Sequence, residues 1–202
     1  MEMRDRQFEA MRAAAQARLA GRTPEELAAR TGMTLADGAL VCETLGRTVT
    51  VRLPDCTAAP ALPKWHTLAL LHYLDLADGT PPSGELMSFG QYPDGMVRGG
   101  GFDRDAEQAI RTLGVLPPEE LLRRCRALGA ALVPSNADLC ARFSFAPHYP
   151  VFLKLWFADE DFPASGRLLA DRSAPHHLSV EDAVTVGSLI LGGLAGTVYW
   201  TA

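Results

Sequence analysis

The segment DLCARFSFAPHYPVFLKLWF, residues 138–157, decides the fold class of this chain. From Val151 to Phe157 the side chains alternate, with Val, Leu, Leu and Phe on one face and Phe, Lys and Trp on the other. A period of two residues is that of a β-strand. The segment therefore predicts a hairpin of two strands, residues 138–145 and 151–157, joined across 146–150.

A second alternating block lies at residues 39–53, where strands 39–45 and 48–53 are joined at Gly46-Arg47. The remaining apolar spacing predicts helices at 5–20, 24–31, 64–77, 103–113, 118–128 and from 180 onward, and short strands at 86–89 and 167–170. Because these elements do not alternate as β-α-β units, we expect an α+β fold. It would have an antiparallel sheet built from the two hairpins and covered by about five to six helices. The length fits a single domain, residues 1–202, with the helical segment 1–32 packing on it.

Charge and composition exclude several classes of protein. The net charge is −5 and no basic run is longer than Arg123-Arg124, so no nucleic-acid partner is expected. The charged first residues contain no apolar signal segment, which predicts a cytoplasmic location. No C-x-x-C pair is present, so no zinc ribbon or cysteine-ligated iron–sulfur cluster is encoded locally. We expect four buried, reduced thiols, at Cys42, Cys56, Cys125 and Cys140.

The stretch 183–202 contains no charged residue, which raises the question of a membrane segment. Ser188, Gly192 and Gly196 form a stripe of small residues, as in transmembrane helix dimers. Its Ser, Thr and Gly content makes the stretch only modestly apolar, and no basic residue flanks its end. We therefore expect no membrane segment, but a buried helix packed closely on a sheet.

A long segment rich in Gly and Pro, residues 78–101, precedes the expected helix 103–113. Loops of this length are usually functional or mobile. Gly99-Gly100-Gly101 could present backbone amides to an anion, but no clear strand precedes these glycines and no Lys follows them. A flexible hinge is the favoured interpretation.

The densest polar patch follows the second hairpin. Carboxylate oxygens suit hard cations, imidazole nitrogens suit transition metals, and a His–Asp pair can act as a general base. In an ordinary turn the same acids would only be solvated, and adjacent histidines in an extended chain point opposite ways. The candidate ligand-binding residues are Asp159, Asp161, Asp171, His176 and His177, with His176 and Asp171 as the candidate metal ligands.

Two other histidines share the expected helix 64–77. His66 and His72 are six residues apart and so lie on different faces, which excludes a helical metal clip. His72 stands among leucines and is expected to be a hydrogen-bonded core residue. Ser179 and Asp182 are expected to cap the final helix. The core, rather than a pocket, is the expected place of Tyr92, Phe102, Tyr149 and Trp156.

Several motifs resemble one known family. They are LLHYL at 70–74, Ser83-Gly84, Ser88-Phe89, Pro93-Asp-Gly95, Leu155-Trp156, DEDFPAS at 159–165, DRSAPH at 171–176 and LSVED at 178–182. Over residues 8–194 the chain is similar to the uncharacterised prokaryotic domain of unknown function 3786 family. The resemblance implies an origin mainly in anaerobes and work near metal or corrinoid redox chemistry, since some members are joined to a four-iron–four-sulfur domain like that of corrinoid proteins. This chain lacks a cluster motif, so a cluster would belong to a partner. It also has Arg98-Gly-Gly-Gly101 where relatives tend to have aromatic residues.

Three functions stay open at this point. The first is a small-ligand-binding or accessory domain of a metal or corrinoid redox system, with an iron–sulfur or corrinoid protein as partner. Its site would lie between the segments 78–102 and 159–177, with His176 contacting the ligand while Asp161 and Asp171 orient it. The second is a metal-assisted hydrolase or lyase using the same residues. The third is a non-catalytic interaction protein, such as a homodimer formed through the C-terminal helix.

Overall fold

The computed structural model describes residues 3–197, and their side chains from Arg6 onward. Nine strands form two antiparallel sheets within this part of the chain. The first sheet has the order β1-β2-β3-β4, with β1 Thr34–Ala36, β2 Ala39–Thr44, β3 Arg47–Arg52 and β4 Thr57–Ala59. The second has the order β5-β9-β8-β7-β6, with β5 Leu86–Met87, β6 Ala131–Leu132, β7 Leu139–Ala146, β8 Tyr149–Trp156 and β9 Ser165–Asp171.

The α+β class is therefore confirmed, but the two hairpins do not share one sheet as the sequence suggested. Each hairpin is flanked on both edges by strands close to it in sequence, so neither leaves an edge for the other. The sheets touch end to end, where the Leu45 amide donates to the Ser144 carbonyl at 2.8 Å. Gly46 of the β2–β3 turn lies against Gly129, where a Cβ on either glycine would approach backbone atoms to less than 3 Å.

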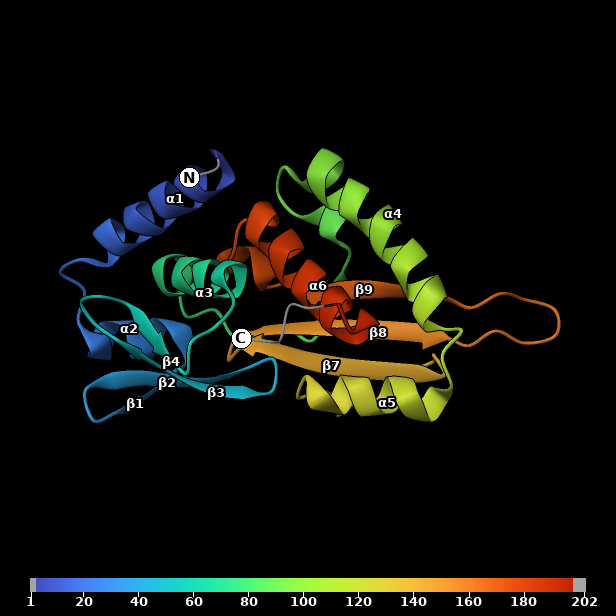
Figure 1. Cartoon of the computed structure of the whole chain (residues 1–202). Helices are drawn as coiled ribbons and strands as arrows, with labels where there is room; N and C mark the ends of the chain where they lie inside the picture. The colour runs from blue at the N-terminus through green and yellow to red at the C-terminus, as the bar shows by residue number, and fades with distance from the viewer. Residues whose placement is uncertain (1–2, 198–202) are drawn as a thin grey trace.

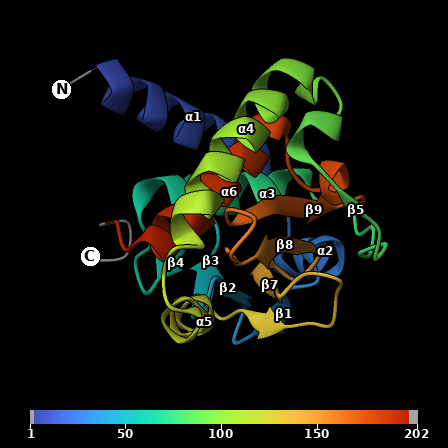
Figure 2. The ribbon, with the colours of Figure 1, turned by 90° about the vertical axis from the view of Figure 1, so that its right-hand side faces the viewer.

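Six α-helices lie around the sheets in the described residues: α1 Met3–Leu19, α2 Pro24–Thr31, α3 Lys64–Leu76, α4 Gly95–Leu113, α5 Pro118–Ala127 and α6 Val180–Ala195. Figure 1 shows α4 and α6 above the second sheet and α5 below it, while α1 lies over α3 at the other end of the molecule. In Figure 2 α4 crosses in front of α6. The short 3₁₀ helices are η1 Phe89–Gln91 and η2 Ala174–His176.

Helix α4 begins eight residues before its predicted start, and the triglycine lies inside it. The interpretation of these glycines as a flexible hinge is therefore wrong. A Cβ on Gly99 would lie 2.0 Å from the Phe89 carbonyl oxygen, so glycine allows α4 to pack directly on the backbone of η1. A run of glycines usually indicates a loop, but here Gly99 is needed because α4 packs closely on η1.

Helix α6 is buried along most of its length, as predicted. It begins at Ser179, whose hydroxyl accepts the Asp182 amide at 3.2 Å, which confirms the predicted cap. Near its end, Arg124 Nη1 donates to the Leu194 carbonyl at 2.8 Å. Within residues 3–197, no helix combines the length and apolarity needed to cross a membrane. The last part of the uncharged stretch, residues 198–202, lies outside the described residues.

The four thiols are free and buried, as expected. Burial raises the pKa of Cys42 to about 12 and that of Cys125 to about 11. Because the thiolate is the reactive form of cysteine, these two side chains are inert packing residues.

Candidate functional site

Asp171, at the end of β9, holds the segment that follows α3 against the second sheet. Its Oδ1 accepts the amide and hydroxyl of Ser83 at 2.8 and 2.9 Å, and those of Ser173 at 2.9 and 2.7 Å. Its Oδ2 accepts the Gly84 amide at 2.8 Å. Burial by itself would raise the pKa of Asp171, but these hydrogen bonds outweigh it and lower the pKa. Through these five hydrogen bonds the carboxylate joins two segments of the chain.

His176 lies on the surface and pairs with Asp78, with 2.8 Å between Nδ1 and Oδ2. About half of each side chain is exposed, 53% for His176 and 47% for Asp78. The hydroxyl and amide of Thr80, followed by the His176 imidazole, lower the pKa of Asp78. The pair therefore joins η2 to the loop after α3 in contact with solvent.

His177 faces the opposite way and is fully buried. Its ring lies 5.7 Å from the Tyr73 ring and 5.8 Å from the His148 ring, measured between centroids. Within the described residues, neither ring nitrogen of His177 has a partner that satisfies both the distance and the angle of a hydrogen bond. Burial lowers the pKa of His177, and the nearby Thr80 backbone opposes this only in part. The two adjacent histidines thus have opposite environments, so they do not act as a pair on one ligand.

Asp159 and Asp161 lie at the other end of β9, in the loop that projects from the molecule after β8 (Figure 1). Asp159 Oδ1 accepts the amides of Asp161 and Phe162 at 2.9 and 2.7 Å, which closes an exposed turn. The seven residues of β9 separate this turn from Asp171 by about 20 Å. The structure therefore does not bring these acids together with His176.

A metal site at His176 and Asp171 stays a prediction. Within the described part of the chain, no three His, Cys, Asp or Glu side chains converge as a metal would require. His176 already contacts Asp78, and a metal on Asp171 would displace donors from Ser83, Ser173 or Gly84. Those donors are buried or half-buried, so displacing them costs free energy.

A second His–Asp pair, which the sequence did not predict, joins α3 to α6. His72 Nδ1 lies 2.6 Å from Asp182 Oδ1, and only 12% and 11% of the two side chains are exposed. Ser179 Oγ donates to the other carboxylate oxygen, Oδ2, at 2.6 Å. A carboxylate accepts only, so the contact places the His72 proton on Nδ1 and leaves Nε2 as the basic nitrogen. The prediction that His72 is hydrogen-bonded is confirmed. Asp182 donates its amide to the capping hydroxyl of Ser179, and its carboxylate orients an imidazole.

Asp182 also lines a groove of about 460 Å³ between α1, α3, α4 and α6, which we call the helical groove. Trp65, Leu68 and Leu189 give it apolar surfaces. Arg98 and Glu181, 2.9 Å apart, form an exposed ion pair at this groove. The other lining residues are Gln7, Met11, Ala69, Val184, Thr185 and Ser188. The helical groove thus combines an apolar surface with one buried, oriented carboxylate.

Two tyrosines lie near Asp182 in the interior. The hydroxyls of Tyr92 and Tyr149 are 2.5 Å apart, and both rings are buried. Burial raises the pKa of both phenols, and the negative charge of Asp182 raises both further. Tyr92, Tyr149 and Phe102 are core residues as expected, whereas Trp156 is only half-buried and donates from its indole to the Asn136 carbonyl.

Comparison with known proteins gives one match, to a protein family, and it covers most of the chain. Neither a curated protein nor a solved structure matches the chain. The family model described as Domain of unknown function (DUF3786) matches residues 23–192, from the start of α2 into the last turns of α6, and leaves α1 outside the match. The chain therefore belongs to this family of domains of unknown function.

Proposed function

We propose that this protein is a small-ligand-binding domain whose ligand lies in the helical groove. The observation that supports the proposal best is the His72–Asp182 pair, which places a buried and oriented carboxylate in the wall of that groove. A buried carboxylate is costly unless its lone pairs are used. His72 and Ser179 use one lone pair on each oxygen, so the carboxylate can accept a further donor from a ligand.

The chemistry of the lining indicates the class of ligand. An apolar group would lie against Trp65, Leu68 and Leu189, where it removes apolar surface from water. A hydroxyl or amino group on the same molecule would donate to Asp182. The ligand is therefore a small molecule with an apolar body and at least one hydrogen-bond donor.

The size of the groove bears on the role in a corrinoid system. A volume of about 460 Å³ is that of an ordinary small-molecule site. It is too small to enclose a corrinoid macrocycle with its side chains. In the accessory role that the family resemblance implies, the corrinoid or iron–sulfur cluster would thus belong to the partner protein, and this domain would bind a smaller molecule.

A second candidate function is hydrolysis or elimination on the bound ligand. A histidine whose Nδ1 is fixed by a carboxylate has the arrangement of a general base, because its Nε2 can take a proton from water or substrate. His176 has the same arrangement with Asp78, but Asp182, the partner of His72, lines the helical groove, and this favours His72 as the base of the hydrolase or lyase. In both candidates the ligand binds in the helical groove beside Asp182, and the candidates differ in whether the ligand is chemically changed.

Equilibrium dialysis against a mixture of metabolites, read by mass spectrometry, tests the proposal. We expect at least one compound to be enriched by the wild-type protein and released by Ser188→Trp, which fills the helical groove from an exposed position of α6. Ser135→Trp, at an exposed serine outside the groove, is the matched control and should retain the compound. If no compound distinguishes Ser188→Trp from Ser135→Trp, the groove is not the site. Turnover of the enriched compound that His72→Gln abolishes would establish the second candidate.

A further inference from the structure

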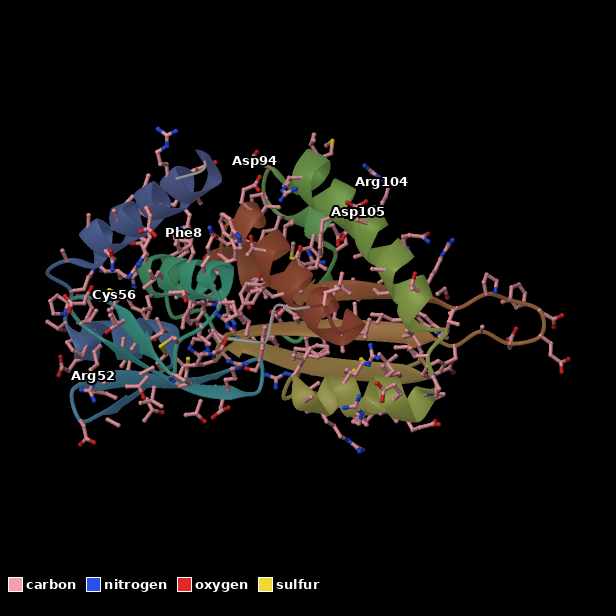
Figure 3. All side chains as sticks on the ribbon, in the orientation of Figure 1. Phe8, Arg52, Cys56, Asp94, Arg104 and Asp105 are labelled. Atoms are coloured by element: carbon pink, nitrogen blue, oxygen red, sulfur yellow. The ribbon has the colours of Figure 1, made fainter. Side chains whose placement is uncertain are left out.

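A second and larger cavity, of about 600 Å³, lies between α1, β4 and the start of α3. We call it the α1 cavity. Phe8, Ala58, Ala61 and Leu62 provide apolar surfaces, and Arg12 and Lys64 are its two cations. Figure 3 labels Phe8 beneath α1 and Cys56, another lining residue, near the start of β4. None of these residues belongs to the helical groove.

Arg12 lines this cavity, and its buried Nε has no hydrogen-bond partner among the described residues. Glu9 Oε2 lies 3.9 Å from Arg12 Nη1, and both side chains are partly exposed, so this ion pair is weak. A guanidinium can donate two parallel hydrogen bonds, which match the two oxygens of a carboxylate, and the accessible donors of Arg12 are its Nη groups.

Lys64 places a second positive charge at the same cavity. Its ammonium lies 4.9 Å from the centroid of the Phe8 ring and 5.6 Å from that of Trp65, within the range of cation–π contacts. The two aromatic rings thus hold the Lys64 ammonium at the start of α3. Among the described residues that line the α1 cavity, two are cations and one, Glu9, is an acid, in a chain of net charge −5.

We infer that the α1 cavity binds a small organic carboxylate with an apolar chain. The carboxylate pairs with the Arg12 guanidinium and the Lys64 ammonium, and the chain lies against Phe8 and Leu62. A cavity of this volume takes a ligand of that size. The carboxylate would bring a negative charge to the two cations that line the cavity.

This site is independent of the proposed function. Phe8 lines the α1 cavity and Trp65 lines the helical groove, and their rings meet edge to face with centroids 5.5 Å apart. The contact between the two rings therefore divides the two spaces. Helix α1 also lies outside the residues that match the family model, so the site depends on a helix that this match does not include.

Titration calorimetry with sodium octanoate tests the inference on the full chain. We expect one octanoate to bind per chain, and Arg12→Gln and Lys64→Gln each to weaken binding at least tenfold. Arg6→Gln, an exposed arginine of α1 outside the cavity, is the matched control and should bind as the wild type does. Octan-1-ol, with the same chain and no charge, should bind at least tenfold more weakly than octanoate, and acetate should not bind measurably.

The variants also separate binding from folding. Because Arg12 Nε has no partner to lose, Arg12→Gln should leave the thermal midpoint close to that of the wild type. Ser188→Trp, which fills the helical groove, should leave octanoate binding unchanged. The inference is overturned if octanoate does not bind, if octan-1-ol binds as tightly, or if Arg12→Gln and Lys64→Gln bind octanoate like Arg6→Gln.

Discussion

Two His–Asp pairs in this protein have nearly the same geometry and very different surroundings. His72 and Asp182 approach to 2.6 Å with about a tenth of each side chain exposed, whereas His176 and Asp78 approach to 2.8 Å with about half of each exposed. Both join segments about a hundred residues apart, 110 in the first pair and 98 in the second. Distance alone therefore does not reveal which pair matters for stability or for binding.

The difference lies in solvent. Water can replace either partner of the exposed pair, so the net free energy of such a contact is small. At Asp182 little water has access, and His72 and Ser179 would lose their partner if the carboxylate were removed. We infer that the stability a carboxylate provides in this fold increases with the number of buried donors that would lose their acceptor without it. The variants below test this rule, from the largest expected loss of stability to the smallest.

The largest effect is expected at Asp171, where the carboxylate has no histidine but accepts five hydrogen bonds. Asp171→Ala leaves the donors of Ser83, Gly84 and Ser173 without a partner, and should lower the free energy of unfolding by about 4 kcal/mol. Urea unfolding followed by circular dichroism measures it. Asp171→Asn keeps one carbonyl oxygen as an acceptor, so its free energy of unfolding should fall by about half as much as that of Asp171→Ala. A loss under about 1 kcal/mol for Asp171→Ala would contradict the dependence on buried donors.

The second variant breaks the buried pair itself. Asp182→Ala should cost about 3 kcal/mol, because the donors of His72 and Ser179 both lose their acceptor in a nearly dry site. Glu181→Ala is the matched control, one residue earlier in the same helix. It breaks the ion pair with Arg98, whose side chains are 55% and 66% exposed, and should cost less than about 1 kcal/mol. Equal losses for Asp182→Ala and Glu181→Ala would contradict the role assigned to burial.

The local part of this architecture follows from the sequence. Two-residue alternation predicted the hairpins containing β2–β3 and β7–β8, and the Ser179 cap was predicted from its spacing to Asp182. The start of α4 was missed, because Gly99-Gly100-Gly101 has the composition of a loop. Only the contact of Gly99 with η1, absent from any local pattern, explains why glycine is needed in that helix.

The candidate site was less predictable for the same reason. The sequence grouped Asp159, Asp161, Asp171, His176 and His177 because they are close along the chain, and β9 then separates the first two from the others. The contact of Asp171 with Ser83, 88 residues apart, depends on tertiary packing that spacing does not encode. The contact of His72 with Asp182, 110 residues apart, depends on tertiary packing in the same way.

The third test concerns His66, a buried histidine that contacts the hydroxyl of Thr44. Burial, and next the charge of Arg47, lower the pKa of His66 to about 4, while its ring accepts or donates a hydrogen bond with Thr44 at 2.7 Å. Between pH 6.5 and 4 the unfolded chain therefore binds a proton that the folded chain does not, so stability falls as the pH falls. We expect a loss of about 2 kcal/mol between pH 7 and pH 5 from this imidazole.

Urea unfolding at pH 7, 6 and 5 measures this slope. His66→Gln can still hydrogen-bond but does not titrate, so it should lose less stability than the wild type over the same range. Gln108→Ala, at an exposed and non-titrating residue of α4, is the control, and its slope should equal that of the wild type. Identical slopes for the wild type and His66→Gln would mean that His66 does not contribute to the pH dependence.

The smallest effect is expected for the exposed pair. Asp78→Ala should lower the free energy of unfolding by less than about 1 kcal/mol, because water replaces the carboxylate on His176 and on Thr80. The pKa of Asp78 is lowered, mainly by Thr80, so what stability it provides is present above the pKa of an unfolded aspartate and is lost as the pH falls through the folded value. Wild type and Asp78→Ala should therefore converge in stability under strongly acidic conditions. A loss as large as that of Asp182→Ala, measured at neutral pH, would show that exposure does not separate the two pairs and that His176 holds the loop after α3 as firmly as His72 holds α6.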